Sequence, residues 1–224
     1  MKLICFGDSL TAGSYGGSYV KAMRALTPDI KIINGGVGGD TVINLQQRLE
    51  SDVLDKQPDS VFLMIGGNDA ISYSQPKTRS YYRNAKGIPD GVVTPDMFAA
   101  AYRDVLMHLH LAGIVVHVGC APVEYSPTVV DTFRQYHALA KEAASAYNVP
   151  VLDMLDMFLP QHVPARPDLD INTILTIGTR EKRGWTDFET ARAEGGFTFT
   201  FDGLHFMPEA AARIGRLISD FVAT

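Results

Sequence analysis

A serine stands where the first apolar run of the chain ends. The stretch Cys5-Phe6-Gly7-Asp8-Ser9-Leu10-Thr11 places its hydroxyl at the turn that must follow such a run. A hydroxyl there can cap the next helix, or it can act as a nucleophile. At neutral pH a nucleophilic serine needs a general base, a group that orients this base, and hydrogen-bond donors for the oxyanion that forms.

Other parts of the chain supply candidates for each of these partners. Asp202 and His205 are three residues apart, a spacing that one tight turn can fold into an aspartate–histidine hydrogen bond. The glycine-rich turn 35–39 can expose backbone N–H groups, and Asn68 follows another apolar run with a side-chain amide. Nucleophile, base, orienting carboxylate and oxyanion donors are the parts of a serine hydrolase.

The order of these short blocks resembles the signature of the GDSL or SGNH hydrolase family. The resemblance spans Gly7 to His205 and rests on Gly7-Asp8-Ser9-Leu10, the glycine turn that ends in Gly39-Asp40, Gly66-x-Asn68-Asp69, and Asp202-x-x-His205. All four blocks occur in the order typical of the family.

We hypothesise that Ser9 attacks an ester carbonyl, that His205 takes and later returns its proton, and that Asp202 orients the imidazole. The resemblance implies that the oxyanion is bound by the backbone N–H groups of Ser9 and Gly39 and by the side-chain amide of Asn68. Water then hydrolyses the acyl-enzyme, so no cofactor is expected.

Four further residues of the same blocks are expected to support the site. Gly7 and Asp8 are predicted to shape the turn before Ser9. Asp40 and Asp69 are predicted to accept hydrogen bonds from loop N–H groups and so hold the oxyanion donors still.

The elements that must position these residues alternate between strand and helix. Strand-length apolar runs, mostly continuous as in a parallel sheet buried on both faces, occur at 3–6, 30–33, 61–65, 114–118 and 149–152. Helical patterns occupy 18–26, 42–54, 95–112, 129–147 and 208–222, which predicts a three-layer α/β fold. Ser9, the Gly39 turn and Asn68 follow the first three strands, where ligands of open α/β sheets bind. The resemblance implies a flavodoxin-like α/β/α sandwich with a central five-stranded parallel sheet.

We expect residues 1–224 to form one domain with insertions at about 72–93 and 160–201. Both insertions adjoin the blocks above, so they are predicted to be lids or pocket walls, with surface loops or a dimer contact as alternatives. Phe197-Thr198-Phe199-Thr200-Phe201 alternates in polarity after two glycines, which predicts a strand or hairpin arm.

Composition narrows the class of protein. A net charge of −5 with 46% hydrophobic and 20% charged residues is typical of a soluble globular chain and disfavours nucleic-acid binding. No 18-residue apolar run occurs, so no membrane span is expected. The first apolar run begins at Leu3 and leaves no room for a signal peptide, which predicts a cytoplasmic protein unless a signal has been removed.

Several other motifs are incomplete. Ser18-x-x-Lys21 lacks the partner motifs of penicillin-binding enzymes, and Thr11 stands where a nucleophile elbow needs glycine. The glycine turn lacks the Gly-Lys-Ser/Thr ending of a phosphate-binding loop. The histidines have no paired ligands at metal spacing, so no metal site is predicted. Cys5 and Cys120 are expected to be buried core residues, and a disulfide between them would require neighbouring strands.

Three alternatives to ester hydrolysis stay open: an acyltransferase on the same site, a ligand-binding module without catalysis, and an interaction protein that uses the Tyr- and Arg-rich insertion 72–93. The expected partner is a small-molecule ester, either an acyl ester or an acetylated carbohydrate. A homo-oligomer is compatible with the sequence, although no pattern specifies one.

Overall fold

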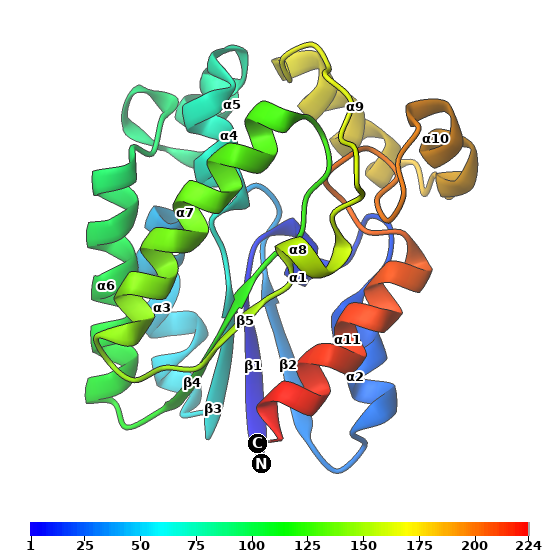
Figure 1. The fold of residues 1–224 in the computed structure, drawn as a ribbon. Helices are drawn as coiled ribbons and strands as arrows, with labels where there is room; N and C mark the ends of the chain where they lie inside the picture. Colours follow the sequence, from blue (N-terminus) through cyan, green and yellow to red (C-terminus); the bar gives the residue numbers. More distant parts are fainter. Residues whose placement is uncertain (224) are drawn as a thin grey trace.

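The computed structural model describes residues 1–223 and has one five-stranded sheet at its centre (Figure 1). Every pairing is parallel, and the strand order is β2-β1-β3-β4-β5. The strands are β1 (Lys2–Gly7), β2 (Lys31–Gly36), β3 (Ser60–Met64), β4 (Val115–Cys120) and β5 (Val151–Asp153). This order is that of flavodoxin-like folds, so the predicted fold class is confirmed.

Helices cover both faces of the sheet, which is why its strands are continuously apolar. Helices α3 (Val42–Asp52), α6 (Pro95–Leu111) and α7 (Pro127–Ser145) lie on one face, and α2 (Tyr19–Leu26) and α11 (Pro208–Val222) on the other (Figure 1). Alternate side chains of β1 enter the two cores: Ile4 and Phe6 join the first, and Leu3 and Cys5 the second. All four are fully buried, as expected for a strand between two helical layers.

The register of the central strands brings their carboxyl ends to one edge. Gly7, the last residue of β1, pairs with Gly36 of β2 on one side and with Met64 of β3 on the other. The loops that carry Ser9, Gly39 and Asn68 therefore leave the sheet side by side.

Local signals in the sequence set the helix ends. In α6 the Thr94 hydroxyl accepts from the Met97 N–H (3.3 Å), and Pro95 occupies the first helical position. Gly113 follows the helix with a φ of 70°, a conformation that glycine adopts without strain. Threonine, proline and glycine are residue types favoured at these three positions.

Both insertions contain helices. The first contains the end of α4 (Gly67–Ser74), η2 (Pro76–Thr78), α5 (Arg79–Lys86) and η3 (Pro89–Gly91). The second contains α9 (Ile171–Lys182) and α10 (Phe188–Gly195), which project beyond the sheet edge (Figure 1). The remaining short helices are α1 (Ser9–Ala12), η1 (Leu54–Lys56) and α8 (Leu155–Phe158).

The strand or hairpin arm predicted at 197–201 forms only in part: the Phe201 N–H donates to the His205 carbonyl (3.1 Å), and the Phe199 carbonyl accepts from the Met207 N–H (2.9 Å). Only Thr200 pairs in β fashion, through an isolated antiparallel bridge to Phe206. The backbone N–H groups of Thr198, Phe199 and Thr200 donate instead to the carboxylate of Glu124. A side chain thus takes the donors that a strand ladder would use.

Cys5 and Cys120 are free and buried. Strand β3 lies between their strands, so the fold does not make those strands neighbours. Burial raises the pKa of each thiol to about 12, which keeps both thiols protonated. No helix within residues 1–223 is both long and apolar enough to cross a membrane.

Candidate active site

Ser9 begins α1, directly after the tight turn that follows β1. Asp8 caps α1 by accepting from the Leu10 N–H (3.0 Å), which makes Ser9 the first residue of that helix. A Cβ on Gly7 would lie 2.3 Å from the Met64 carbonyl oxygen and 2.4 Å from the Thr11 hydroxyl. The strand can therefore turn this sharply only with glycine at position 7.

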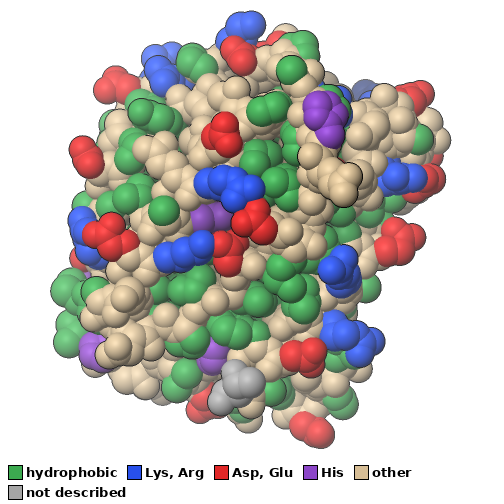
Figure 2. Space-filling view, in the orientation of Figure 1, with side chains coloured by type: hydrophobic (Ala, Val, Ile, Leu, Met, Phe, Trp, Pro, Cys, Tyr) green, Lys and Arg blue, Asp and Glu red, His purple; other side chains and the backbone are tan. Residues whose placement is uncertain are grey.

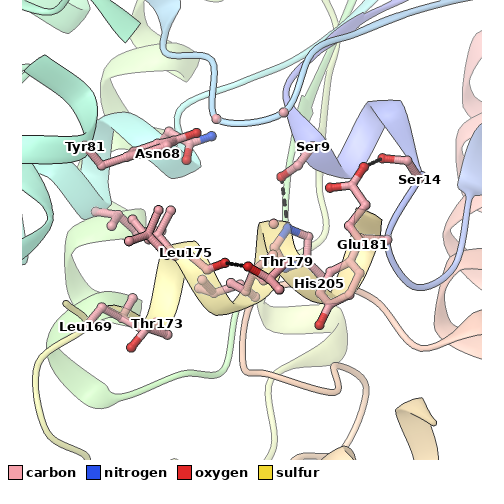
Figure 3. Close-up of a pocket in the computed structure, with 18 of the residues that line it drawn as sticks. Ser9, Ser14, Asn68, Tyr81, Leu169, Thr173, Leu175, Thr179, Glu181 and His205 are labelled. Carbon is pink, nitrogen blue, oxygen red and sulfur yellow. Dashed lines mark hydrogen bonds between the residues drawn. The ribbon is translucent and has the colours of Figure 1, made fainter. Parts of the chain in front are cut away.

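The structure brings the three residues of the predicted triad together. The Ser9 hydroxyl lies 3.0 Å from His205 Nε2, although the two residues are 196 positions apart (Figure 3). His205 Nδ1 lies 2.8 Å from Asp202 Oδ2. The other oxygen of that carboxylate accepts from the backbone N–H groups of Leu204 (3.0 Å) and His205 (2.7 Å), which fixes the turn.

The surroundings of His205 favour its role as a base. Burial by itself would lower the pKa of the imidazole, but the charge and hydrogen bond of Asp202 outweigh it and raise the pKa above the ordinary value. With Nδ1–H donating to Asp202, Nε2 is left to accept the Ser9 proton. The Ser9–His205–Asp202 arrangement is thus that of an activated hydroxyl.

Two backbone N–H groups beside Ser9 are available to an anion. Within residues 1–223, neither the Ser9 nor the Gly39 N–H has an acceptor in the protein. Both residues line a cavity of about 370 Å³. Gly39 has a φ of 77°, and a Cβ there would lie 2.1 Å from the Tyr81 hydroxyl oxygen, so glycine is required at this position.

The Asn68 side chain lies at the same end of the cavity (Figure 3). Its amide oxygen accepts from the Tyr82 hydroxyl (2.9 Å), which fixes which end of the amide is nitrogen. The nitrogen donates to the Asp40 carbonyl (3.0 Å) and, over a longer distance of 3.3 Å, to Asp8 Oδ2. The amide is thus oriented before any ligand binds.

Asp40 does not have the bonding that the sequence predicted. Its carboxylate accepts from the Arg48 guanidinium (2.8 Å) and the Lys86 ammonium (2.7 Å) rather than from loop N–H groups. Arg48 also donates to the carbonyls of Gly35 and Gly7, each at 2.9 Å. This ion-pair network ties the glycine turn to the end of β1.

Asp69 does accept from a backbone N–H, as predicted. Both of its oxygens lie near the Val42 N–H, at 3.0 and 3.2 Å, at the start of α3. Full burial raises the pKa of Asp69 to about 8 and that of Asp8 to about 6. The catalytic or supporting roles of these carboxylates stay predictions.

Sequence analysis assigned no supporting role to Arg48, Tyr82 or Lys86, whose side chains hydrogen-bond Asp40 or Asn68. Arg48 also lies over the Phe6 ring, with 4.4 Å from its guanidinium carbon to the ring centroid. Half-buried charged residues such as Arg48 and Lys86 can be recognised only when the fold is known, because their sequence neighbours form no motif. The period of α3 could have indicated that Arg48 lies near its buried face.

Helix α9 of the second insertion forms one wall of the cavity (Figure 3). Its Thr173, Ile177 and Glu181 line the cavity together with Tyr81, and the Ser14 hydroxyl donates to Glu181. Part of 160–201 is thus a pocket wall, one of the two roles predicted for it. On the molecular face shown in Figure 2, acidic and basic side chains are interspersed and form no extended basic surface.

One group of side chains outside this cavity has metal-ligand chemistry. The ligand atoms of Cys120, His137 and Asp153 lie within 4.8 Å of one another. Both Asp153 oxygens already have donors, the Leu155 N–H (3.1 Å) and the Lys141 ammonium. The Lys141 ammonium is thus already paired with this carboxylate, and the absence of a metal site stays a prediction.

Comparison with known proteins confirms the family that the sequence motifs resemble. Residues 5–210 match the model of the GDSL-like Lipase/Acylhydrolase family. The lipoprotein YqeF of Bacillus subtilis, described as uncharacterized, is 36% identical over 86 residues, covering 34% of this chain and 35% of that protein. An acetylxylan esterase of Geobacillus stearothermophilus is 37% identical over 86 residues, covering 30% of this chain and 39% of that protein.

These matches span less than half of each curated relative. The crystal structure of the acetyl xylan esterase AlAXEase superposes with a TM-score of 0.67 at 20% identity and covers 100% of both chains. That likeness shows the shared fold.

Proposed function

Since the chain belongs to the GDSL-like lipase/acylhydrolase family, we propose that it hydrolyses carboxylic esters through a Ser9–His205–Asp202 triad. The observation that carries the proposal is the continuous hydrogen-bonded path from the Ser9 hydroxyl through His205 to Asp202, at 3.0 and 2.8 Å. At 3.0 Å, the Ser9 hydroxyl is close enough to His205 Nε2 to transfer its proton.

In the proposed reaction, the Ser9 oxygen attacks the ester carbonyl while His205 Nε2 takes the hydroxyl proton. Asp202 stabilises the imidazolium that forms and does not itself take a proton. The carbon–oxygen bond to the leaving alcohol then breaks, and His205 protonates that alcohol. Water, deprotonated by His205, attacks the acyl-Ser9 ester, and cleavage of this ester releases the acid and regenerates the serine.

The negative oxygen of each tetrahedral intermediate would be held by the Ser9 and Gly39 N–H groups and by the Asn68 amide. The free N–H groups need no rearrangement. Asn68 would exchange its longer bond, the one of 3.3 Å to Asp8, for the oxyanion. A donor already oriented by Tyr82 costs little reorganisation, which is the basis of electrostatic catalysis.

For the substrate, we propose an ester of a short acid, with acetylated carbohydrates as the first class to test. The name of the Geobacillus relative, acetylxylan esterase, supports this class. The cavity supports it as well, because Ile71, Ile174 and Leu204 offer apolar contacts and Glu181 and Lys182 offer polar ones. Sugars bind to such mixed surfaces through both ring faces and hydroxyls.

The test is hydrolysis of p-nitrophenyl esters from acetyl to decanoyl, and of acetylated xylo-oligosaccharides, by the wild type, Ser9→Ala and Ser14→Ala. Ser14 is the matched control, because it lines the same cavity but hydrogen-bonds Glu181 instead of His205. We expect Ser9→Ala to lose more than about 10³-fold in kcat and Ser14→Ala to keep activity of the wild-type order. Equal activity of Ser9→Ala and wild type, or a folded wild type inactive on every ester, would contradict the proposal.

A further inference from the structure

Glu124 is a buried carboxylate that no step of the proposed reaction uses. It lies in the segment between β4 and α7, and only 2% of the residue is exposed. Its Oε1 accepts from the N–H groups of Thr198 (3.0 Å), Phe199 (2.9 Å) and Thr200 (2.8 Å) and from the Thr200 hydroxyl (2.7 Å). Its Oε2 accepts from the Thr198 N–H (3.0 Å) and the Thr198 hydroxyl (2.6 Å).

These bonds explain how a negative charge is tolerated inside the protein. Burying a carboxylate is costly unless charge or hydrogen bonds compensate it. In residues 1–223 no lysine, arginine or histidine forms an ion pair with Glu124, so the direct compensation comes from three consecutive backbone N–H groups and two hydroxyls. The charge of Arg192 adds a longer-range attraction. Hydrogen bonds to an ionised acceptor are about twice as strong as neutral ones, so this segment is held firmly.

The segment that Glu124 holds leads directly into the turn of Asp202 and His205. The Thr200 hydroxyl, which donates to Glu124, also accepts from the Gly203 N–H (3.0 Å). The Glu124 N–H donates to the Gly203 carbonyl (3.2 Å). Both polar backbone groups of the residue after Asp202 are therefore bound by Glu124 or by its hydroxyl partner.

Gly203 also packs closely against the chain segment that contains Glu124. With a φ of 88° this glycine lies in the left-handed region, and a Cβ on it would meet the Tyr125 Cα at 2.8 Å. Close packing against the segment of Glu124 thus requires glycine here. On the other side, the Phe201 N–H donates to the His205 carbonyl (3.1 Å), which closes the loop around Asp202.

We propose that Glu124 is a positioning residue for the triad, acting through the Thr200 hydroxyl and Gly203 to fix the Asp202 carboxylate against His205. In the described residues 1–223, Glu124 forms no hydrogen bond with any of the three triad side chains. The inference rests on the proposed function for its kinetic consequence, while its structural consequence, a fixed Asp202–His205 contact, can be measured without substrate.

His205 itself reports whether the contact is intact. The carboxylates that act on it come from three segments: Asp202 of its own turn, Asp8 before α1, and Glu181 of α9. Tyr15 packs edge-on against its ring at a centroid distance of 5.4 Å. Because Asp202 contributes most to raising the imidazole pKa, a loosened turn lowers that pKa.

The test compares Thr200→Val with Thr200→Ser and with Thr132→Val. Valine keeps the shape of threonine but removes the hydroxyl that links Glu124 to Gly203, whereas serine keeps that hydroxyl. Thr132 is the matched control, because it is a buried threonine of α7 whose hydroxyl donates to the Thr128 carbonyl (2.8 Å). The His205 pKa is measured by NMR titration of histidine-labelled protein, and kcat and KM are measured on p-nitrophenyl acetate.

We expect Thr200→Val to lower the His205 pKa by about half a unit or more and kcat by about tenfold or more, with a smaller change in KM. Thr200→Ser and Thr132→Val should keep both values near wild type. Glu124→Gln should act like Thr200→Val, because it places an amide nitrogen where the N–H groups of 198–200 or the Thr198 hydroxyl need an acceptor. If Thr200→Val does not fold, Glu124→Gln serves as the test of the positioning role.

Folded Thr200→Val and Glu124→Gln proteins that melt earlier but keep the wild-type His205 pKa and kcat would overturn the inference, because Glu124 would then serve folding alone. The result is distinct from a failure of the proposed function. A wild type without esterase activity refutes the function, yet a lowered His205 pKa in Thr200→Val would still support the positioning role.

Discussion

Replacing Asn68 by alanine separates the proposed catalytic role of this residue from its structural one. The change removes the one side-chain donor proposed for the oxyanion. Loss of a single such donor typically lowers kcat by about 10²–10³-fold, which corresponds to about 2.7–4 kcal/mol of transition-state stabilisation. KM should change little, because the donor acts mainly on the charge that develops in the transition state.

The same change has a predictable cost in folding. The Tyr82 hydroxyl donates to Asn68 Oδ1 (2.9 Å), and Tyr82 is 1% exposed. Asn68→Ala leaves this buried hydroxyl without an acceptor, at a cost of about 1–3 kcal/mol in the free energy of unfolding. Adding Tyr82→Phe removes the orphaned hydroxyl, so the double variant should recover much of that stability.

Urea unfolding gives the stability of each protein, and kcat on p-nitrophenyl acetate gives the activity. We expect Asn68→Ala and Asn68→Ala/Tyr82→Phe to differ in stability and to share the same loss of kcat. A kcat of Asn68→Ala within fivefold of wild type would remove Asn68 from the oxyanion site. Recovery of kcat together with stability in the double variant would show that the loss reflected folding.

Three further outcomes are expected. Since the pKa of His205 is raised above the ordinary 6.5 and its neutral form is the base, kcat/KM should fall as pH drops through a value above 6.5; a pH–rate profile with its acid limb below that value would contradict this. Gly39→Ala puts a Cβ 2.1 Å from the Tyr81 hydroxyl at a φ of 77° and should cost about 1–3 kcal/mol, whereas Gly38→Ala, with its nearest contact at 3.9 Å, should unfold in urea like wild type. Burial raises the pKa of Asp69 from 3.8 to about 8, so the folded protein keeps a proton that the unfolded chain releases. The contribution of Asp69 to stability is therefore fully present below about pH 4 and is lost as pH rises through 8, and urea unfolding at pH 5 and 8 should show a smaller decline for Asp69→Asn than for wild type.

The sequence predicted the sheet and the triad because each leaves a local pattern. The continuous apolar runs at 3–6 and 61–65 identify buried parallel strands, and they became β1 and β3. Ser9 and Asn68 follow those strands directly, so their meeting at one edge could be inferred without knowing the strand order. Asp202 and His205 are close enough in sequence for one turn to join them.

The prediction failed where backbone groups bind distant side chains. The run 197–201 alternates as a strand does, yet the N–H groups of its three central residues donate to Glu124, 74 positions away from Thr198. Asp40 was expected to hold loop N–H groups, yet its partners are Arg48 and Lys86, which come from α3 and α5. Nothing in the residue types of these segments distinguishes the two outcomes.

The sequence by itself therefore determined the family, the alternation of strands and helices, and the candidate triad, since apolar period and short motifs are properties of neighbouring residues. The tertiary structure alone decided which buried charges support the site. Every residue except proline carries the same backbone N–H and carbonyl groups, so only the folded chain shows which of them are left unpaired for Glu124, Arg48 or a substrate oxyanion to bind.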